Sequence, residues 1–341
     1  MNKILVTGGC GYIGSHTLVD LIDNGFQVIS IDNLSNSSDS ILENVEEITG
    51  KKVKNYNIDL VDLSAVKQVF QENSDLVGVI HFAAFKAVGE SVKQPLRYFN
   101  NNLNSLLNVL ACMKEFEVKN LIFSSSCSVY GNTTALPVIE ETPLQEAESP
   151  YARTKQMGEQ ISADFCKTHQ DFNIILLRYF NPAGAHESGK LGEAPTANVS
   201  NLVPVVMETA VGKRKEVVVF GDDYDTRDGS CIRDYIHVQD LANAHTKSLT
   251  YLLADKNDKN CETFNVGIGE GVTVLEAIKA FEKVAQQDLN YRIGPRRGGD
   301  VVAIYANYAK AAEKLGWQPQ RSIEDIMRTA WAWENVRYAT V

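Results

Sequence analysis

The first fourteen residues constrain the fold of this chain more than any other stretch, because an apolar run there breaks into closely spaced glycines. Residues 4–6 are apolar, and Gly8, Gly11 and Gly14 follow them. Apolar residues then recur at helical spacing as far as Gly25. This pattern predicts a strand, a tight turn and a helix whose free N–H groups and positive dipole end attract an anion. The absence of side chains at the three glycines would let a pyrophosphate come close.

An acidic residue ends the next predicted strand, residues 27–32. Asp32 follows the glycines at close to the ~20-residue interval at which an acid binds the adenosine ribose of a dinucleotide. A carboxylate there would repel a 2′-phosphate, so NAD is favoured over NADP. Glycine triplets also occur in ordinary loops, but here strand, helix and acid supply the context that the motif requires. With Thr7 in front, the spacing resembles that of the extended short-chain dehydrogenase/reductase superfamily.

The net charge and the composition of the chain exclude several function classes. The chain has 341 residues and a net charge of −10, which gives no general attraction for nucleic acid or an anionic membrane. We find neither a signal-like apolar segment at the start nor a run of the ~18 apolar residues that a membrane span needs. The six cysteines show no CxxC pairing and are interpreted as reduced thiols of a cytoplasmic protein. The six histidines show no HxxxH spacing, so no metal is expected.

The first half of the chain alternates strand-like and helix-like segments. Near-continuous apolar runs such as residues 77–82 are typical of strands buried on both faces of a parallel sheet. The remaining strands are expected at 4–6, 27–32, 53–59, 121–123 and 174–177, and helices at 63–70, 104–116 and 151–167. The fold class is therefore α/β, with a Rossmann-type doubly wound parallel sheet.

The alternation of strand-like and helix-like segments ends after residue 182, where a loop rich in Gly, Ala, Pro and Asn begins. We expect an NAD-binding domain over 1–180 and a smaller mixed α/β lobe over 181–341, with segments near 235–260 free to return to the first domain. Ligands of open α/β sheets bind at the carboxyl ends of the strands, so the site is expected between the lobes. The elements expected in the second half are helices at 203–211, 240–253, 273–286, 307–315 and 323–336, and strands at 217–220, 263–266 and 289–293.

Tyr151 and Lys155 are four residues apart and would share one face of a helix. A free tyrosine has a pKa near ~10, and a nearby ammonium together with a positive nicotinamide ring would lower it. The phenol could then take a hydroxyl proton while the C–H hydride leaves the same carbon. The alternative is an ordinary amphipathic helix that begins after Pro150. The glycine turn and a serine cluster at the end of residues 121–123 favour the catalytic interpretation.

Three further side chains are candidates for the site. Ser126 could hydrogen-bond the reacting oxygen, although spacing alone does not select it from its serine neighbours. Arg233 and Arg297 could clamp a diphosphate, because guanidinium binds such groups in bidentate fashion. Solvation at the surface, or ion pairing with Asp234 or Asp300, is an equally good account of the two arginines.

At this level of detail the chain resembles the UDP-glucose 4-epimerase family, nearly from end to end. Residues 86–91 and 228–238 carry the most specific part of the resemblance. The other matching segments are 7–16, 32–34, 81–85, 124–131, 149–155, 177–182 and 296–300.

The resemblance implies a tightly held NAD and a homodimer. It also implies interconversion of UDP-galactose and UDP-glucose through a transient 4-keto sugar and bound NADH, with Tyr151 as the base. Lys155 would contact the nicotinamide ribose and lower the tyrosine pKa, and Ser126 would bind the sugar 4-oxygen. Held by its diphosphate, the keto sugar would turn over and present its other face.

By the same resemblance, a larger set of residues would form the two binding regions. The expected cofactor contacts are Gly8, Gly11, Tyr12, Ile13, Gly14, Asp32, Asn33, Leu34, Ser35, Asn36, Ser37, Asp59, Leu60, Phe82, Ala83, Ala84, Phe85, Lys86, Asn101, Ser126, Tyr151, Lys155 and Phe180. The expected substrate contacts are Ser126, Tyr151, Asn181, Asn201, Leu202, Val218, Val219, Phe220, Arg233, Tyr235, Arg297 and Asp300.

Two positions depart from the family pattern, and two other functions compete. Phe85 replaces a usual leucine, and Ile304 stands where the family has a small or a large residue said to gate N-acetylated sugars. A nucleotide-sugar 4,6-dehydratase would need an Asp-Glu pair at positions held here by Cys127 and Ser128. A non-catalytic NAD-sensing protein would typically lack the tyrosine or the lysine, and this chain has both.

Overall fold

The central element of the computed structural model is a seven-stranded sheet. The structure describes residues 1–194, 199–297 and 301–339. The strand order is β11-β6-β5-β4-β1-β2-β3, and every neighbouring pair is parallel. The strands are β1 (Lys3–Thr7), β2 (Gln27–Ile31), β3 (Lys54–Tyr56), β4 (Leu76–His81), β5 (Asn120–Ser124), β6 (Asn173–Tyr179) and β11 (Cys261–Val266). The predicted doubly wound parallel sheet is confirmed.

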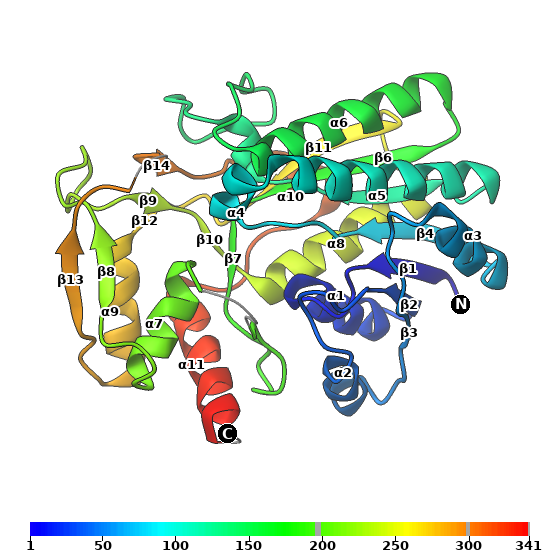
Figure 1. The fold of residues 1–341 in the computed structure, drawn as a ribbon. Coiled ribbons are helices and arrows are strands. Elements are labelled where there is room, and N and C mark those ends of the chain that lie inside the picture. The colour runs from blue at the N-terminus through cyan, green and yellow to red at the C-terminus, as the bar shows by residue number, and fades with distance from the viewer. Residues whose placement is uncertain (195–198, 298–300, 340–341) are drawn as a thin grey trace.

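Helices cover both faces of this sheet, because the side chains of each strand alternate between two apolar cores (Figure 1). In β1, Ile4 and Val6 belong to one core and Leu5 to the other. The first core includes α1 (Tyr12–Asp23), α2 (Ile41–Thr49), α8 (Val238–Leu253) and α10 (Ala309–Leu315). The second includes α3 (Leu63–Glu72), α5 (Pro95–Glu115) and α6 (Pro150–Thr168), and α4 (Val88–Lys93) packs on α5 and α6.

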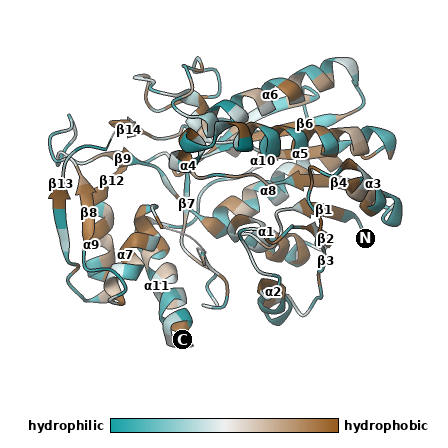
Figure 2. Cartoon of the chain, viewed as in Figure 1, coloured by the Kyte–Doolittle hydropathy of each residue, from teal (hydrophilic) through white to brown (hydrophobic). Residues whose placement is uncertain are grey.

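The rest of the chain builds a second lobe with its own apolar core, which Figure 1 shows on the side away from the N-terminus. Its helices are α7 (Leu202–Ala210), α9 (Val274–Ala285) and α11 (Ile323–Ala339). Figure 2 shows the apolar course of β8 (Val217–Phe220), which pairs in parallel with β13 (Tyr291–Gly294). Four short segments complete the lobe: β9 (Ile232–Arg233), β10 (Tyr235–His237), β12 (Val272–Thr273) and β14 (Ala303–Ile304). β10 pairs with β7 (Asn181–Ala183).

The chain crosses between the two regions more than once. After β10, α8 packs against α1, and β11 then adds to the large sheet beside β6. β10 and α8 are consecutive in sequence, so the second lobe is joined to the sheet by continuous backbone as well as by packing. In the part of the chain that the structure describes, no helix is both long and apolar enough to cross a membrane.

The predicted elements and the observed ones differ mainly at the short and polar segments. The helix expected at 104–116 begins much earlier, with Pro95 in its first turn, because its asparagine-rich start hides the helical spacing. α2, α4 and the two- and three-residue strands of the second lobe were not predicted. Such short segments carry too few residues for a hydrophobic period to show.

Candidate active site

The glycine turn after β1 leaves no space for side chains. A Cβ built on Gly14 would lie 2.1 Å from the carbonyl oxygen of Gly8, and one on Gly8 would lie 3.0 Å from the nitrogen of Ala83. Gly8 also has a φ of +71°, which favours glycine. Gly11 is the N-cap of α1 and makes no side-chain cap. The bare turn at a helix N-terminus therefore suits the pyrophosphate of a dinucleotide.

Asp32, directly after β2, fastens this turn to the loop that follows. Its carboxylate accepts hydrogen bonds from the N–H of Cys10 at 3.0 Å, from the N–H of Leu34 at 2.9 Å and from the Ser37 hydroxyl at 2.8 Å. Leu34 has a φ of 57°, a conformation that a leucine adopts only when its surroundings hold it there. The acid thus shapes residues 33–37 at the edge where an adenosine ribose is expected.

The predicted adenine-side residues lie next to this loop. The Asn33 amide donates to the Asp59 carboxylate at 3.2 Å, and that carboxylate accepts the N–H of Val61 at 2.9 Å. The buried Leu60 is held by its carbonyl, which accepts a hydrogen bond at 2.8 Å from Asn108 of α5. Asn108 was not predicted, because its role depends on where α5 lies relative to the segment after β3.

The segment after β4 is fixed by an asparagine that the sequence analysis missed. The side chain of Asn102 accepts from the N–H of Phe85 at 2.8 Å and donates to its carbonyl at 3.0 Å. It also donates to the hydroxyl of Thr154 on α6 at 3.1 Å. Asn101, which was predicted, donates to Asn102 at 3.0 Å. A polar residue one helical turn after the buried Tyr98 is the signal that could have identified Asn102.

Phe85, the departure from the family pattern, packs on protein side chains. Its ring lies 5.6 Å from the ring of Tyr98, and the Arg97 guanidinium lies 4.4 Å from its centroid. The neighbouring Lys86 pairs with Glu193 at 3.4 Å, which joins this segment to the loop after β7. The substitution is therefore accommodated by packing.

The three predicted catalytic residues lie together at the carboxyl end of β5. Ser149 caps α6 by accepting the N–H of Ala152 at 3.2 Å, which places Tyr151 in the first turn. The Ser126 hydroxyl is near enough to the Tyr151 phenol to act on its pKa. Lys155 is buried one turn further on and donates to the carbonyl oxygen of Ser124 at 2.6 Å. The tyrosine therefore has a neighbouring hydroxyl and a nearby cation.

The electrostatics of this group differ from our expectation. Burial raises the pKa of the Tyr151 phenol, the nearby Tyr179 adds to the rise, and the Ser126 hydrogen bond opposes it. Burial also lowers the pKa of the Lys155 ammonium to about 8, and its Nζ lies 6.0 Å from the centroid of the Tyr151 ring. The expected lowering of the phenol pKa is thus not achieved by the lysine within the polypeptide, because desolvation outweighs it.

Two polar pairs behind the catalytic group were also missed. The Tyr179 hydroxyl lies 2.5 Å from that of Ser124, and the Thr7 hydroxyl lies 2.8 Å from Nδ1 of His81. Burial, with the Lys155 charge, lowers the pKa of His81 to about 3, so this ring is neutral. These pairs join the ends of β1, β4, β5 and β6, the edge where the site was expected.

Of the two predicted diphosphate-binding arginines, Arg233 lies on β9 and Arg297 follows β13. The pairing of β7 with β10 sets Asn181 opposite Tyr235. Arg233 donates to the carbonyl of Val301 at 2.8 Å. Burial raises the pKa of the Cys127 thiol to about 12, and the charge of nearby Arg233 opposes the rise. Arg233 is therefore close to the segment that carries Ser126.

The second arginine lies beside an exposed aromatic ring. The Arg297 guanidinium is 5.4 Å from the centroid of Phe220, whose side chain is 39% exposed at the end of β8, after Val218 and Val219. Asn201 is the N-cap of α7 and Leu202 its first residue. Asp300, also predicted, lies outside the described residues.

Asp234 binds main-chain groups. Its carboxylate accepts the N–H groups of Ile268 at 2.8 Å, Gly269 at 3.1 Å and Ala306 at 3.0 Å. Burial raises the pKa of this carboxyl to about 6. These bonds give Asp234 a structural role in addition to any pairing with Arg233.

Ile304 lies at the junction of the lobes. It is buried in a small apolar cluster with Val129, Tyr130, Val138, Phe180 and Ala306. Its pairing in β14 sets it opposite Arg233. The residue at the proposed gate is therefore held between the arginine strand and the serine segment.

Comparison with known proteins finds relatives that match nearly the whole chain. Residues 5–330 match the family model described as GDP-mannose 4,6 dehydratase. The UDP-glucose 4-epimerase of Bacillus subtilis is 47% identical over 332 residues, 97% of this chain and 96% of that protein. The enzyme of the same name from Dictyostelium discoideum is 44% identical, over 98% of this chain and 96% of its own length.

Solved structures give the same result. The UDP-glucose 4-epimerase of Bifidobacterium longum, in complex with NAD+ and UDP, superposes with a TM-score of 0.94 at 48% identity, and each chain is fully covered. The Stenotrophomonas maltophila enzyme, with bound NAD and formylated UDP-arabinopyranose, gives 0.96 at 42% identity, again over the whole of both chains. The resemblance therefore extends across both lobes.

Proposed function

This chain belongs to the UDP-glucose 4-epimerase family, and from that premise we propose how its own residues interconvert UDP-galactose and UDP-glucose. The enzyme is an NAD-dependent isomerase of UDP-sugars. The observation that carries the proposal is the grouping of Tyr151 and Ser126 within one helical turn of the buried Lys155, which donates to the carbonyl of Ser124 at 2.6 Å.

Tyr151 acts as the proton carrier in this proposal. It takes the proton of the sugar 4-hydroxyl, and Ser126 hydrogen-bonds the same oxygen. Bound NAD supplies the hydride acceptor for C4 and a positive ring charge next to the phenol. Lys155 contributes a second cation and contacts the nicotinamide ribose. After the 4-keto sugar has turned over, C4 would take the hydride back on its opposite face, and Tyr151 would return the proton to the same 4-oxygen.

The glycine turn and its neighbours would hold the dinucleotide. The pyrophosphate would lie at the N-terminus of α1, in the turn between Gly8 and Gly14, whose N-cap Gly11 carries no side-chain cap. Asp32 and the loop it fastens would bind the adenosine ribose. The further contacts proposed are Tyr12, Ile13, Asn33, Leu34, Ser35, Asn36, Ser37, Asp59, Leu60, Phe82, Ala83, Ala84, Phe85, Lys86, Asn101 and Phe180.

The second lobe would hold the UDP part of the substrate. Arg233 and Arg297 would neutralise the diphosphate, which an acidic chain with a net charge of −10 can bind only through local cations. Phe220 would stack on the uracil, with Arg297 over its ring. Contact at the diphosphate leaves the sugar free to rotate. The further contacts proposed are Asn181, Asn201, Leu202, Val218, Val219, Tyr235 and Asp300.

Dehydration is the nearest competing reaction, since the matching family model is described as a dehydratase. Elimination of water needs an acid and a base at the positions after Ser126. These positions are Cys127, whose buried thiol has a raised pKa of about 12, and Ser128. Neither side chain fits that role, so epimerisation is the better assignment.

We also propose a location, a domain division and an oligomeric state. The six cysteines are free thiols, as suits the cytoplasm. Residues 1–180 with α8, β11 and α10 form the NAD-binding domain, and the rest of 181–341 forms the UDP-sugar lobe. The packed pair α5 and α6 exposes Leu96, Leu107 and Met157, which supports a homodimer through this face. Light scattering should give twice the chain mass, and Leu107→Glu should reduce it to one chain.

The function is tested with Tyr151→Phe, which removes the phenol oxygen and keeps the ring. Purified wild-type protein should convert UDP-galactose without added NAD, with the products identified by NMR. The variant should keep its dinucleotide and lose about 10²–10⁴-fold in turnover. Turnover near that of the wild type would contradict the role proposed for Tyr151.

A further inference from the structure

A buried ion pair lies one helical turn beyond Lys155. Glu159 of α6 and Arg178 of β6 are each 7% exposed, and they join through two parallel contacts, Nε to Oε1 at 2.9 Å and Nη2 to Oε2 at 2.7 Å. Forming such a pair costs both ions their hydration, so it requires close geometry and further hydrogen bonds. This pair has both.

The carboxylate of the pair reaches the catalytic serine segment. The hydroxyl of Ser125 donates to Oε1 of Glu159 at 2.5 Å. Ser125 directly precedes Ser126, whose hydroxyl is near enough to the Tyr151 phenol to act on its pKa. The position of Glu159 is therefore transmitted to the oxygen that faces the substrate.

The guanidinium of the pair holds the other side of that segment. Nη1 of Arg178 donates to the Tyr130 hydroxyl at 3.1 Å and to the carbonyl of Glu140 at 3.0 Å. Tyr130 ends the short helix that starts at Cys127, directly after Ser126. The ion pair therefore hydrogen-bonds the serine segment on both sides of Ser126, through Ser125 and Tyr130.

The pair also determines the charge around Lys155. The titratable groups facing this ammonium are Tyr151 and Glu159 on α6, His81 at the end of β4, and Tyr179 of β6, whose hydroxyl bonds Ser124. His81 and the two tyrosines are neutral near pH 7, since burial lowers the pKa of the histidine and raises those of the phenols. Among these described groups, the negative charge is that of Glu159.

Burial alone disfavours the ammonium. It lowers the pKa of Lys155 to about 8, and the charge of Glu159 opposes this effect. Without that carboxylate the lysine would lose its proton at a lower pH. The cation proposed to act next to Tyr151 then depends on a carboxylate four residues further along the same helix.

We infer that Glu159, held in place by Arg178, is a positioning residue that keeps Lys155 charged and fixes the serine segment carrying Ser126. This inference rests on the role proposed above for Lys155. It assigns a task in the reaction to two side chains that the sequence analysis left unassigned.

Two substitutions test this inference, one removing the negative charge of the pair and the other removing its positive charge. Glu159→Gln removes the negative charge and leaves that of Arg178, so Lys155 should deprotonate earlier. The alkaline limb of the kcat/KM profile, which should lie near pH 8 in the wild type, should move down by about one pH unit. Arg178→Gln leaves the carboxylate unopposed, so the limb should move up. Glu159→Asp keeps the charge and should restore the limb even where kcat is reduced.

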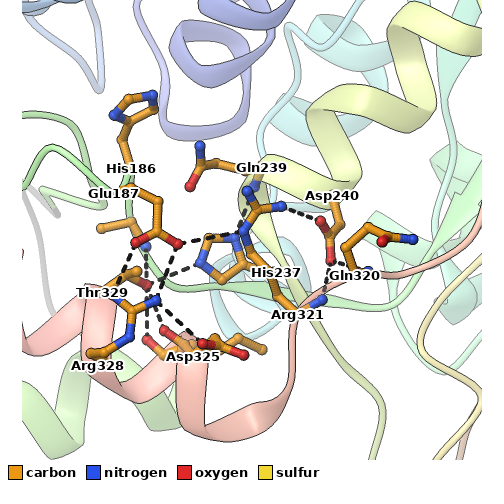
Figure 3. A network of polar contacts seen from close by, with 12 residues as sticks. His186, Glu187, His237, Gln239, Asp240, Gln320, Arg321, Asp325, Arg328 and Thr329 are labelled. Carbon is orange, nitrogen blue, oxygen red and sulfur yellow. Dashed lines mark hydrogen bonds and ion pairs between the residues drawn. The ribbon is translucent and has the colours of Figure 1, made fainter.

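The control is another ion pair with a buried carboxylate, on α8 instead of α6. Figure 3 shows Asp240 of α8 bound to Arg321, and its carboxylate also accepts the N–H of Gln320 at 2.9 Å. Asp240 is 2% exposed, as buried as Glu159. Asp240→Asn should lower the melting temperature and leave the alkaline limb at its wild-type pH.

The outcomes separate this inference from the function itself. Folded, active Glu159→Gln protein with the limb of the wild type would overturn the inference and leave the epimerase assignment intact. If Glu159→Gln does not fold, an unmoved limb in Arg178→Gln overturns it equally. A wild-type protein that does not interconvert the two UDP-sugars would instead refute the proposed function.

Discussion

At the scale of single residues, the turn at Gly14 shows how the absence of a side chain becomes a binding property. The carbonyl of Gly8 occupies the space of a Cβ at Gly14, so α1 can approach β1 closely. The helix N-terminus is thereby brought to the place where an anion is to bind. Packing and cofactor binding depend on the same missing atom.

Gly14→Ala should therefore damage both properties. The added methyl would meet main-chain atoms, which cannot move aside as a flexible side chain can, so we expect a loss of more than ~2 kcal/mol of stability. Cofactor content, measured by absorbance after denaturation, should fall at least tenfold.

The matched control is Gly89→Ala in α4, where an added Cβ meets no atom within 4 Å. This substitution should change stability by less than about 1 kcal/mol and leave the bound dinucleotide unchanged. Full cofactor content in Gly14→Ala would show that the turn tolerates a side chain.

Residue identity and residue environment were predictable to different degrees. Spacing and strand context indicated Tyr151, Lys155 and a serine cluster, and the family resemblance selected Ser126 from that cluster. The structure brings these three residues together. The direction of the Tyr151 pKa was not predictable, because burial depends on everything that packs around the helix. Asn102 was missed for the same reason, since its partners lie on two other elements.

At the scale of elements, the start of α6 positions Tyr151, the tyrosine proposed to carry the proton. Pro150 is pre-organised for the first helical position, and Ser149 satisfies a free N–H there. The first turn is therefore rigid, and Tyr151 belongs to it.

Ser149→Ala should lower kcat by more than its effect on stability explains. Loss of the cap costs about 1 kcal/mol. It also frees the turn that carries Tyr151, so kcat should fall several-fold, as measured in the conversion of UDP-galactose.

The control for the Ser149 cap is Asp62, which caps a different helix. It caps α3 by accepting the N–H groups of Ser64 and Ala65, at 3.0 and 3.2 Å. Asp62→Ala should lower the melting temperature by a similar amount and leave kcat unchanged. Equal kcat values in the two variants would show that the α6 cap has no special link to the reaction.

Long elements could be predicted and short ones could not. The strands and helices around the large sheet have enough residues to display their period, and their order follows from the β-α alternation. β9, β10, β12 and β14 have two or three residues each and exist because other segments pair with them. They nevertheless carry Arg233 and Tyr235, and only the family resemblance pointed to Tyr235 in advance.

At the scale of the whole molecule, buried histidines link the stability of both lobes to pH. Burial lowers the pKa of His16 and His245 to about 4, and that of His81 and His237 to about 3. His237 lies in the network of Figure 3, where its Nε2 is 3.0 Å from the hydroxyl of Thr329 on α11. It stands where β10 passes into α8, the junction between the lobes.

The sign of the effect follows from proton binding. Below pH ~6.5 the unfolded chain protonates these four rings and the folded protein does not, so their stabilising contribution is present above that pH and is lost as pH falls toward 4. The contribution of each ring to the free energy of unfolding falls by about 1.4 kcal/mol per pH unit in this range. The melting temperature should therefore drop between pH 7 and pH 5.5.

His237→Asn should make this pH dependence shallower. Asparagine can still cap α8, where the ring now accepts the N–H of Gln239 at 3.1 Å, and it does not titrate. A melting temperature that stayed constant between pH 7 and pH 5.5 in the wild type would contradict the buried, neutral state of these rings.

The most direct test of the central claim follows one hydrogen atom of the substrate. If oxidation and re-reduction take place within one visit of the ligand, UDP-galactose carrying deuterium at C4 should give UDP-glucose with the deuterium still at C4, in ordinary water and without added NAD. Mass spectrometry and NMR of the product measure its position and content. Retention of the label is what we predict, and its loss to solvent would contradict the account.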